Sequence, residues 1–221
     1  MVTMPISSRA VPLVDHTVNI PSFVLVGKMA SGKDTYAAEL KEQEERRFGV
    51  EVHRLSSSPD VIAEASQRLC RPAEKSRDRS FIQQVGVEMS VLDPGIWGRR
   101  LAKRILLRKS FPFIVDALRS PEDVASVRET FPDVLVLRVE PVDDAHRLEA
   151  YLRTYGRPAT KEQLEYKSEK TVMDIVPDAV IVNSYQIRGL REQVTSIVDA
   201  IDRGRLEQLL RNKSPIQSSG S

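Results

Sequence analysis

The stretch from Phe23 to Thr35, FVLVGKMASGKDT, decides the fold of this chain. Four apolar residues lead into Gly27, Gly32 comes five positions later, and Lys33 follows at once. This is the Gly-x-x-x-x-Gly-Lys spacing of a Walker A phosphate loop. The spacing alone also fits an ordinary glycine turn between a strand and a helix. The order of strand, loop and helix favours the phosphate loop.

The residue types of the loop suit an anion. The small residues Ala30, Ser31 and Gly32 let backbone N–H groups surround a phosphate. A helix that begins near Lys33 points its unpaired N–H groups at the same anion. The Lys33 ammonium adds positive charge for the outer phosphates of a nucleotide. The sequence therefore predicts that residues 27 to 35 bind ATP.

The metal ligands are less conventional. Asp34 stands where the motif usually has Ser or Thr, and Thr35 follows it. A carboxylate holds a hard cation directly or through water, so we expect Asp34 to take part in binding Mg²⁺. The apolar run FPFIVD ends in Asp116, as in a buried parallel strand with an acid at its carboxyl edge. We expect Asp116 to be the second metal ligand; the alternative is a strand-ending Asp that caps the next turn.

Apolar runs alternate with amphipathic segments along the chain, which predicts an α/β fold. We expect a three-layer parallel sheet with helices on both faces and ligands at the carboxyl ends of the strands. Expected strands are 22–26, 50–55, 111–116, 134–139 and 178–183. The first helix is expected to place its charged end, KEQEERR (41–47), in solvent.

Three arginines lie in the charged segment HRLEAYLRTYGRP: Arg147, Arg153 and Arg157. Arginines that arrive when a lid closes stabilise the charge of a phosphoryl group in transfer. We expect Arg147 and Arg153 to be catalytic and Arg157 to contact the nucleotide, within a lid at about 143–168. The alternative is a solvated charged helix.

A second group of candidates would hold the phosphoryl acceptor. Arg79 and Gln83 share one face of a predicted helix at 78–90; an arginine suits a phosphate and a glutamine suits a base edge. Arg119 follows Asp116 by three residues and would reach a phosphate. The alternative is an amphipathic helix with a polar outer face.

Composition sets the remaining limits. The chain has 221 residues, a net charge of +2 and one cysteine. One cysteine excludes an intramolecular disulfide and suits a reducing compartment, so we expect a cytoplasmic protein. No apolar run reaches the ~20 residues of a membrane span. We expect a flexible extension at 1–20, one P-loop domain at 21–204, and a helix end with a disordered tail at 205–221.

With these residues in place, the chain resembles P-loop kinases of the nucleoside monophosphate kinase type, and most closely the deoxynucleoside monophosphate kinases of bacteriophages. The resemblance rests on GKMASGKDT (27–35), on the block from Arg79 to Glu88, and on the strand ending in Asp116. Leu118 stands where that family has an arginine, and DALRSPED is closer to dephospho-CoA-kinase-like proteins. GKxxSGKD also occurs in animal-type phosphomevalonate kinases.

The resemblance implies an ATP- and Mg²⁺-dependent transfer of the γ-phosphoryl group to a nucleoside or deoxynucleoside monophosphate. Two alternatives stay open. One changes the acceptor to dephospho-CoA, phosphomevalonate or a modified base in DNA, so a nucleic acid is not favoured but remains an acceptor to test. The other is a nucleotide-binding module without turnover. A homodimer is also left open.

Overall fold

The computed structural model describes residues 20–164 and 167–206. The predicted extension at 1–20 and the predicted tail at 205–221 therefore fall almost entirely outside the described residues. Within the described part, no helix is long and apolar enough to cross a membrane.

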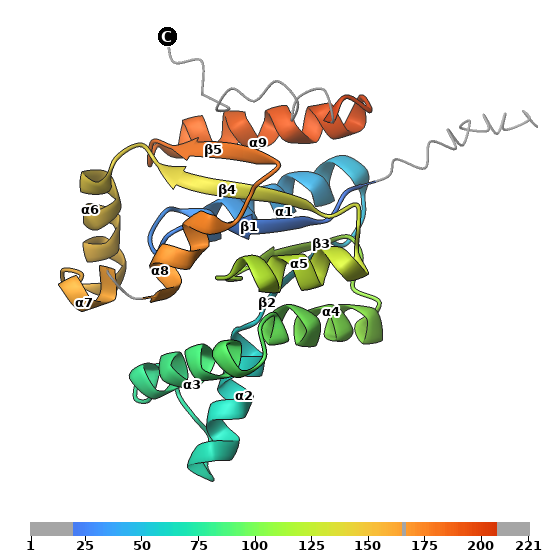
Figure 1. The fold of residues 1–221 in the computed structure, drawn as a ribbon. Coiled ribbons are helices and arrows are strands. Elements are labelled where there is room, and N and C mark those ends of the chain that lie inside the picture. Colours follow the sequence, from blue (N-terminus) through green and yellow to red (C-terminus); the bar gives the residue numbers. More distant parts are fainter. Residues whose placement is uncertain (1–19, 165–166, 207–221) are drawn as a thin grey trace, which may run out of the picture.

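A five-stranded parallel sheet forms the centre of the molecule, with strand order β2-β3-β1-β4-β5 (Figure 1). The strands are β1 (Phe23–Val26), β2 (His53–Ser56), β3 (Phe113–Asp116), β4 (Leu135–Pro141) and β5 (Ala179–Asn183). Because β1 lies between β3 and β4, the loop that follows β1 leaves the sheet at its middle, where the order of the strands reverses. Ligands bind at such a switch point in parallel sheets. The predicted fold class is confirmed.

Helices cover both faces of this sheet. On one face lie α1 (Lys33–Phe48) and α9 (Ile187–Asp202); on the other lie α4 (Ile96–Arg108) and α5 (Pro121–Thr130) (Figure 1). The side chains of β1 alternate between the two layers: Phe23 and Leu25 join the core under α1, whereas Val24 and Val26 join the core under α4. A strand buried on both faces needs a continuous apolar run, which explains the sequence FVLV.

The second strand differs from its prediction. The pattern of valines placed it at 50–55, but β2 begins only at His53. Gly49 ends α1 in the left-handed region, with φ of 67°. The Val52 N–H then donates to Glu45 Oε1 at 3.0 Å, so the chain is still tied to α1 at this point.

The first helix also departs from its prediction at one residue. Glu44, in the segment expected to lie in solvent, is completely buried. Tyr36, Leu40 and Glu44 are four residues apart, so they share the face that α1 turns toward the sheet and α9. Packing of the whole helix, not the charge of one residue, sets this orientation.

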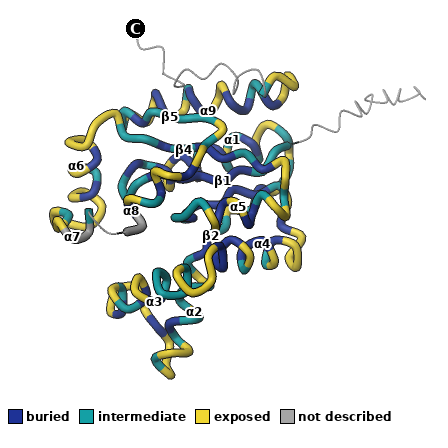
Figure 2. The backbone as a smooth tube through the Cα atoms, viewed as in Figure 1, coloured by how far each residue is buried: buried dark blue, intermediate teal, exposed yellow. Residues whose placement is uncertain are grey.

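Two further units flank the sheet. Helices α2 (Ser58–Leu69) and α3 (Arg79–Leu92) form a hairpin with a small core of its own, and most of their residues are of intermediate burial or exposed (Figure 2). On another side lie α6 (Asp144–Tyr155), α7 (Lys161–Leu164), α8 (Lys167–Thr171) and the 3-10 turn η1 (Val172–Asp174). Gly156, with φ of 67°, ends α6 where the sequence predicted a break.

Candidate active site

The loop between β1 and α1 has the backbone of a phosphate cradle. Gly27 and Gly32 have φ of 150° and 90°, and Ala30 has φ of 59°. A Cβ on Gly27 would lie 2.4 Å from the Val139 carbonyl oxygen, and one on Gly32 would lie 2.0 Å from the Asn183 amide nitrogen. Both glycines are therefore required by the close approach of β4 and β5 as well as by their dihedral angles.

Side chains hold the carbonyl groups of this loop. Asn183 Nδ2 donates to the Ser31 carbonyl oxygen at 2.9 Å, and the Tyr185 hydroxyl donates to the Ala30 carbonyl oxygen at 2.7 Å. These two bonds fix the carbonyl groups of the loop toward β5 and the residues after it. The Ser31 hydroxyl is buried and has no hydrogen-bond partner among the described residues. A nucleotide phosphate oxygen would give this hydroxyl a partner.

Lys33 begins α1 and is only 6% exposed, with its Nζ donating to the Lys28 carbonyl oxygen at 3.4 Å. Burial, with a smaller contribution from the charge of Arg119, lowers the pKa of Lys33 from 10.5 to about 8. Nearby carboxylates oppose this shift of the pKa, namely Asp34, Glu169 and Asp116. Buried positive charge beside a cradle of N–H groups favours an anionic ligand.

The two predicted metal ligands, Asp34 and Asp116, lie close together because both bind the side chain of Arg54. Asp116, at the end of β3, accepts from Arg54 Nε at 2.6 Å, and Asp34 accepts from the same guanidinium, through Arg54 NH2, at 3.0 Å. Two carboxylates that share one cation are donors of the kind that Mg²⁺ prefers. They fit the metal in chemistry and proximity, and the Arg54 guanidinium lies between them. Thr35 is exposed and is not among the described residues that line the cavity.

A carboxylate from α8 faces the loop. Glu169 is 7% exposed, and its Oε2 accepts from the Met29 backbone N–H at 2.7 Å. Its Oε1 pairs with Arg119 at 3.0 Å, and Arg119 also donates to the Gly27 carbonyl oxygen at 3.3 Å. Arg119, predicted from its distance to Asp116, is thus at the loop. Glu169 satisfies groups that a phosphate oxygen would also satisfy.

Arg79 and Gln83, both on α3, line the same cavity as Lys33 and Asp116, which has a volume of about 1010 Å³. The aromatic ring of Tyr155, the last residue of α6, lies 5.3 Å from the Arg79 guanidinium. The cavity therefore spans the phosphate loop, the carboxyl ends of β2 and β3, and the α2–α3 hairpin.

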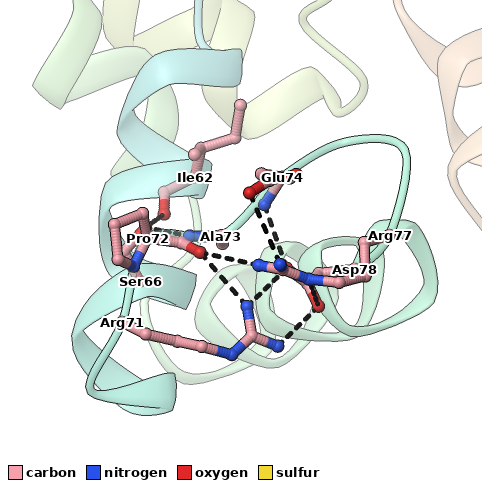
Figure 3. A network of polar contacts seen from close by, with 8 residues as sticks. All are labelled: Ile62, Ser66, Arg71, Pro72, Ala73, Glu74, Arg77 and Asp78. Atoms are coloured by element: carbon pink, nitrogen blue, oxygen red, sulfur yellow. Dashed lines mark hydrogen bonds and ion pairs between the residues drawn. The ribbon is translucent and has the colours of Figure 1, made fainter.

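The corner that begins α3 is fixed by an ion network (Figure 3). The Asp78 carboxylate accepts from Arg71 at 2.7 and 2.8 Å, from Arg77, and from the Glu74 backbone N–H at 3.0 Å. Arg71, Arg77 and this N–H hold the pKa of Asp78 well below its ordinary value. Since Arg79 follows directly, the network sets where the polar face of α3 begins.

The three arginines of the predicted lid lie away from the lining of this cavity. Arg147 is 7% exposed and its Nε donates to Asp144 Oδ1 at 2.8 Å; Arg153 and Arg157 are exposed. None of the three is among the described residues that line the cavity. Of the described residues in the predicted lid segment, Tyr155 lines the cavity, and Glu169, just after that segment, lines it too.

Sequence reasoning missed Arg54, Tyr155 and Glu169. Arg54 is polar in a short, half-exposed edge strand, where a charged residue is ordinary. Tyr155 stands one residue before the helix-ending glycine and Glu169 in a charged segment, so neither carried a local signal.

Comparisons with known proteins find only solved structures of low sequence identity to this chain. No protein-family model and no curated protein matches the chain. Shikimate kinase from Acinetobacter baumannii in complex with shikimate is 15% identical with a TM-score of 0.48, over 85% of this chain and 96% of that chain. APS kinase from Mycobacterium tuberculosis in complex with AMPPNP and APS is 18% identical with a TM-score of 0.45, over 82% and 98%. A gluconokinase from Sinorhizobium meliloti is 14% identical with a TM-score of 0.43, over 87% and 94%.

Similarity this low assigns no activity or substrate to the chain. The class of fold is therefore assigned from the chain's own geometry. A glycine loop leaves the central strand of a parallel sheet, a buried lysine begins the next helix, and an acid ends the neighbouring strand. These features define an α/β protein of the P-loop NTPase type.

Proposed function

We propose that this chain is an ATP- and Mg²⁺-dependent phosphotransferase that moves the γ-phosphoryl group to a nucleoside or deoxynucleoside monophosphate. One observation carries the proposal. A single cavity is lined by Lys33 next to the phosphate loop, by Asp116 at the strand end, and by Arg79 and Gln83 on the hairpin. Phosphoryl transfer requires that donor and acceptor lie in line within one site. A single cysteine supports a cytoplasmic setting for this reaction.

On the donor side, the loop N–H groups and Lys33 bind the phosphates, and the N-terminus of α1 stabilises their charge. Asp34 and Asp116 would hold Mg²⁺, which when bound neutralises charge on the phosphates. Lys33 and Arg119 both lie beside the loop. Lys33 would bind the outer phosphates of the donor, and Arg119 would bind the transferring or the accepting phosphate.

On the acceptor side, Arg79 binds the phosphate of the acceptor through its guanidinium, and Gln83, one turn along α3, binds a base edge. Tyr155 lies over Arg79 and limits where that guanidinium points. Arg147, Arg153 and Arg157 belong to the lid and act on the transferred group only when the lid closes. Closure excludes water, which would otherwise receive the phosphoryl group.

A second candidate keeps the reaction and changes the acceptor. Apolar side chains of the α2–α3 hairpin line the cavity: Val61, Ile62, Ile82, Val87 and Val91. An apolar wall of this extent favours an acceptor with an apolar part, such as phosphomevalonate or dephospho-CoA.

Two further alternatives make different predictions. A modified base in DNA would bind with a strong salt dependence. A nucleotide-binding module would bind ATP and transfer nothing.

The test is a coupled assay of ADP formation over a panel of nucleoside monophosphates, dephospho-CoA and phosphomevalonate. We expect turnover to depend on a nucleoside monophosphate and to fall roughly 10²-fold or more in Lys33→Ala, because the lost charge acts on the phosphoryl group in transfer. Lys103→Ala is the matched control, because Lys103 is an exposed lysine of α4 that does not line the cavity. ATP consumption that no nucleoside monophosphate changes would reject the proposed acceptor.

A further inference from the structure

The strongest unexplained feature of the cavity is the place of Arg54. Its guanidinium bridges Asp116 and Asp34, with nitrogen–oxygen distances of 2.6 Å and 3.0 Å. These acids come from different elements, one from the end of β3 and the other from the first turn of α1. Arg54 thus forms an ion pair with both acids of the expected metal site, and the charge of Lys33 lies near the same two acids.

We propose that Arg54 is a positioning residue that keeps a divalent cation out of the Asp34–Asp116 pair until nucleotide phosphates arrive. The inference rests on the proposed function in one respect, that a metal–nucleotide is the donor. Two adjacent carboxylates repel each other, and a cation between them offsets that repulsion. A metal ion beside the guanidinium would be repelled by it, so the pair accepts either Arg54 or the metal. Nucleotide phosphates add the negative charge that favours the metal.

Arg54 is placed so that it leaves this position once another cation replaces it at Asp116, whose side chain is only 9% exposed. It lies on β2, an edge strand of the sheet, and its side chain is 34% exposed. One of its two partners, Asp34, is 75% exposed, so that half of the bridge is a surface pair of small net strength. No part of the apolar core has to move when the guanidinium swings into solvent.

An ordinary edge-strand salt bridge would make a different prediction. If Arg54 only tied β2 to β3, its removal would alter stability and change metal affinity only through the lost charge, by about 1 kcal/mol or less than tenfold at an exposed site. If it occupies the metal's place, its removal creates a cation site that needs no nucleotide.

The experiment measures binding of Mn²⁺ alone to the full chain, from the electron paramagnetic resonance signal of free Mn²⁺. We expect the Kd for Mn²⁺ to fall at least tenfold in Arg54→Leu relative to wild type. Arg128→Leu is the matched control, since Arg128 pairs with Asp178 outside the cavity and is also 34% exposed. Adding Asp116→Asn to Arg54→Leu should abolish the gain.

A change in Kd smaller than tenfold, or an equal gain in the control, overturns the proposal. A second measurement uses the wild-type protein, so it does not depend on whether Arg54→Leu folds. Water-proton relaxation should show tight protein-bound Mn²⁺ only with ADP present, and equal binding without ADP also overturns the proposal. These Mn²⁺ measurements require neither a phosphoryl acceptor nor turnover. A failed kinase assay with the expected Mn²⁺ result therefore rejects the proposed function and keeps the role of Arg54.

Discussion

Glu44 should make the stability of this protein fall as the pH rises through neutrality. Its side chain is completely buried on the inner face of α1, and neither carboxylate oxygen has a hydrogen-bond partner among the described residues. The hydroxyl of Tyr36, two turns earlier on the same face, is also buried without such a partner. Burial, with a smaller contribution from the charge of Glu45, raises the pKa of Glu44 from 4.5 to about 8.

The direction of the change in stability with pH follows from the number of protons that the folded and the unfolded chain bind. Between pH 4.5 and about 8 the folded protein keeps a proton on Glu44 that the unfolded chain has lost. The stabilisation is therefore complete below pH 4.5 and is lost as the pH rises to about 8. At roughly 1.36 kcal/mol per pH unit, the loss over this window is about 5 kcal/mol. That is a large fraction of the stability of an ordinary domain.

The perturbation is Glu44→Gln, which keeps the shape of the side chain and removes its titration. Urea unfolding at a series of pH values gives the free energy of unfolding of each protein. The variant should be more stable than wild type near pH 8, and its advantage should shrink by about 1.4 kcal/mol per pH unit toward pH 5. Glu42→Gln, an exposed glutamate of the same helix, is the control and should show no such trend.

A difference between Glu44→Gln and wild type that stays constant from pH 5 to pH 8 would refute the reasoning. It would mean that the Glu44 carboxylate is solvated or paired in solution, so that the folded state does not hold its proton more tightly than the unfolded chain.

Two other substitutions test the packing and the loop. Gly98→Ala should destabilise the protein by about 1–3 kcal/mol in thermal unfolding, because its Cβ would lie 2.0 Å from the Asp123 carbonyl oxygen. Gly86→Ala should cost much less, because its Cβ would lie 3.4 Å from Val61 Cγ1, an ordinary contact distance. Glu169→Gln should lower the Kd for ATP severalfold by calorimetry, since a negative charge leaves the phosphate loop; weaker binding would show that this carboxylate supports the nucleotide site.

The sequence by itself determined the frame of the site. The glycine spacing and the apolar runs are local signals, because a left-handed φ or a strand buried on both faces restricts the residue at each position. Gly27, Gly32 and Lys33 accordingly lie where the motif predicted. Asp116 was found in the same way, since parallel strands bring their carboxyl ends to one edge of the sheet.

Only the tertiary structure decided which charges meet within that frame. Arg54 joins Asp34 and Asp116 from 20 and 62 residues away, and Glu169 reaches Met29 across 140 residues. Nothing local marks such pairs, because a charged side chain in an edge strand or a short helix has the same pattern whether it faces solvent or the cavity. Glu44 is the converse case: its charge predicted exposure, but the apolar face of α1 buried it, since the packing energy of a whole helix outweighs the preference of one residue.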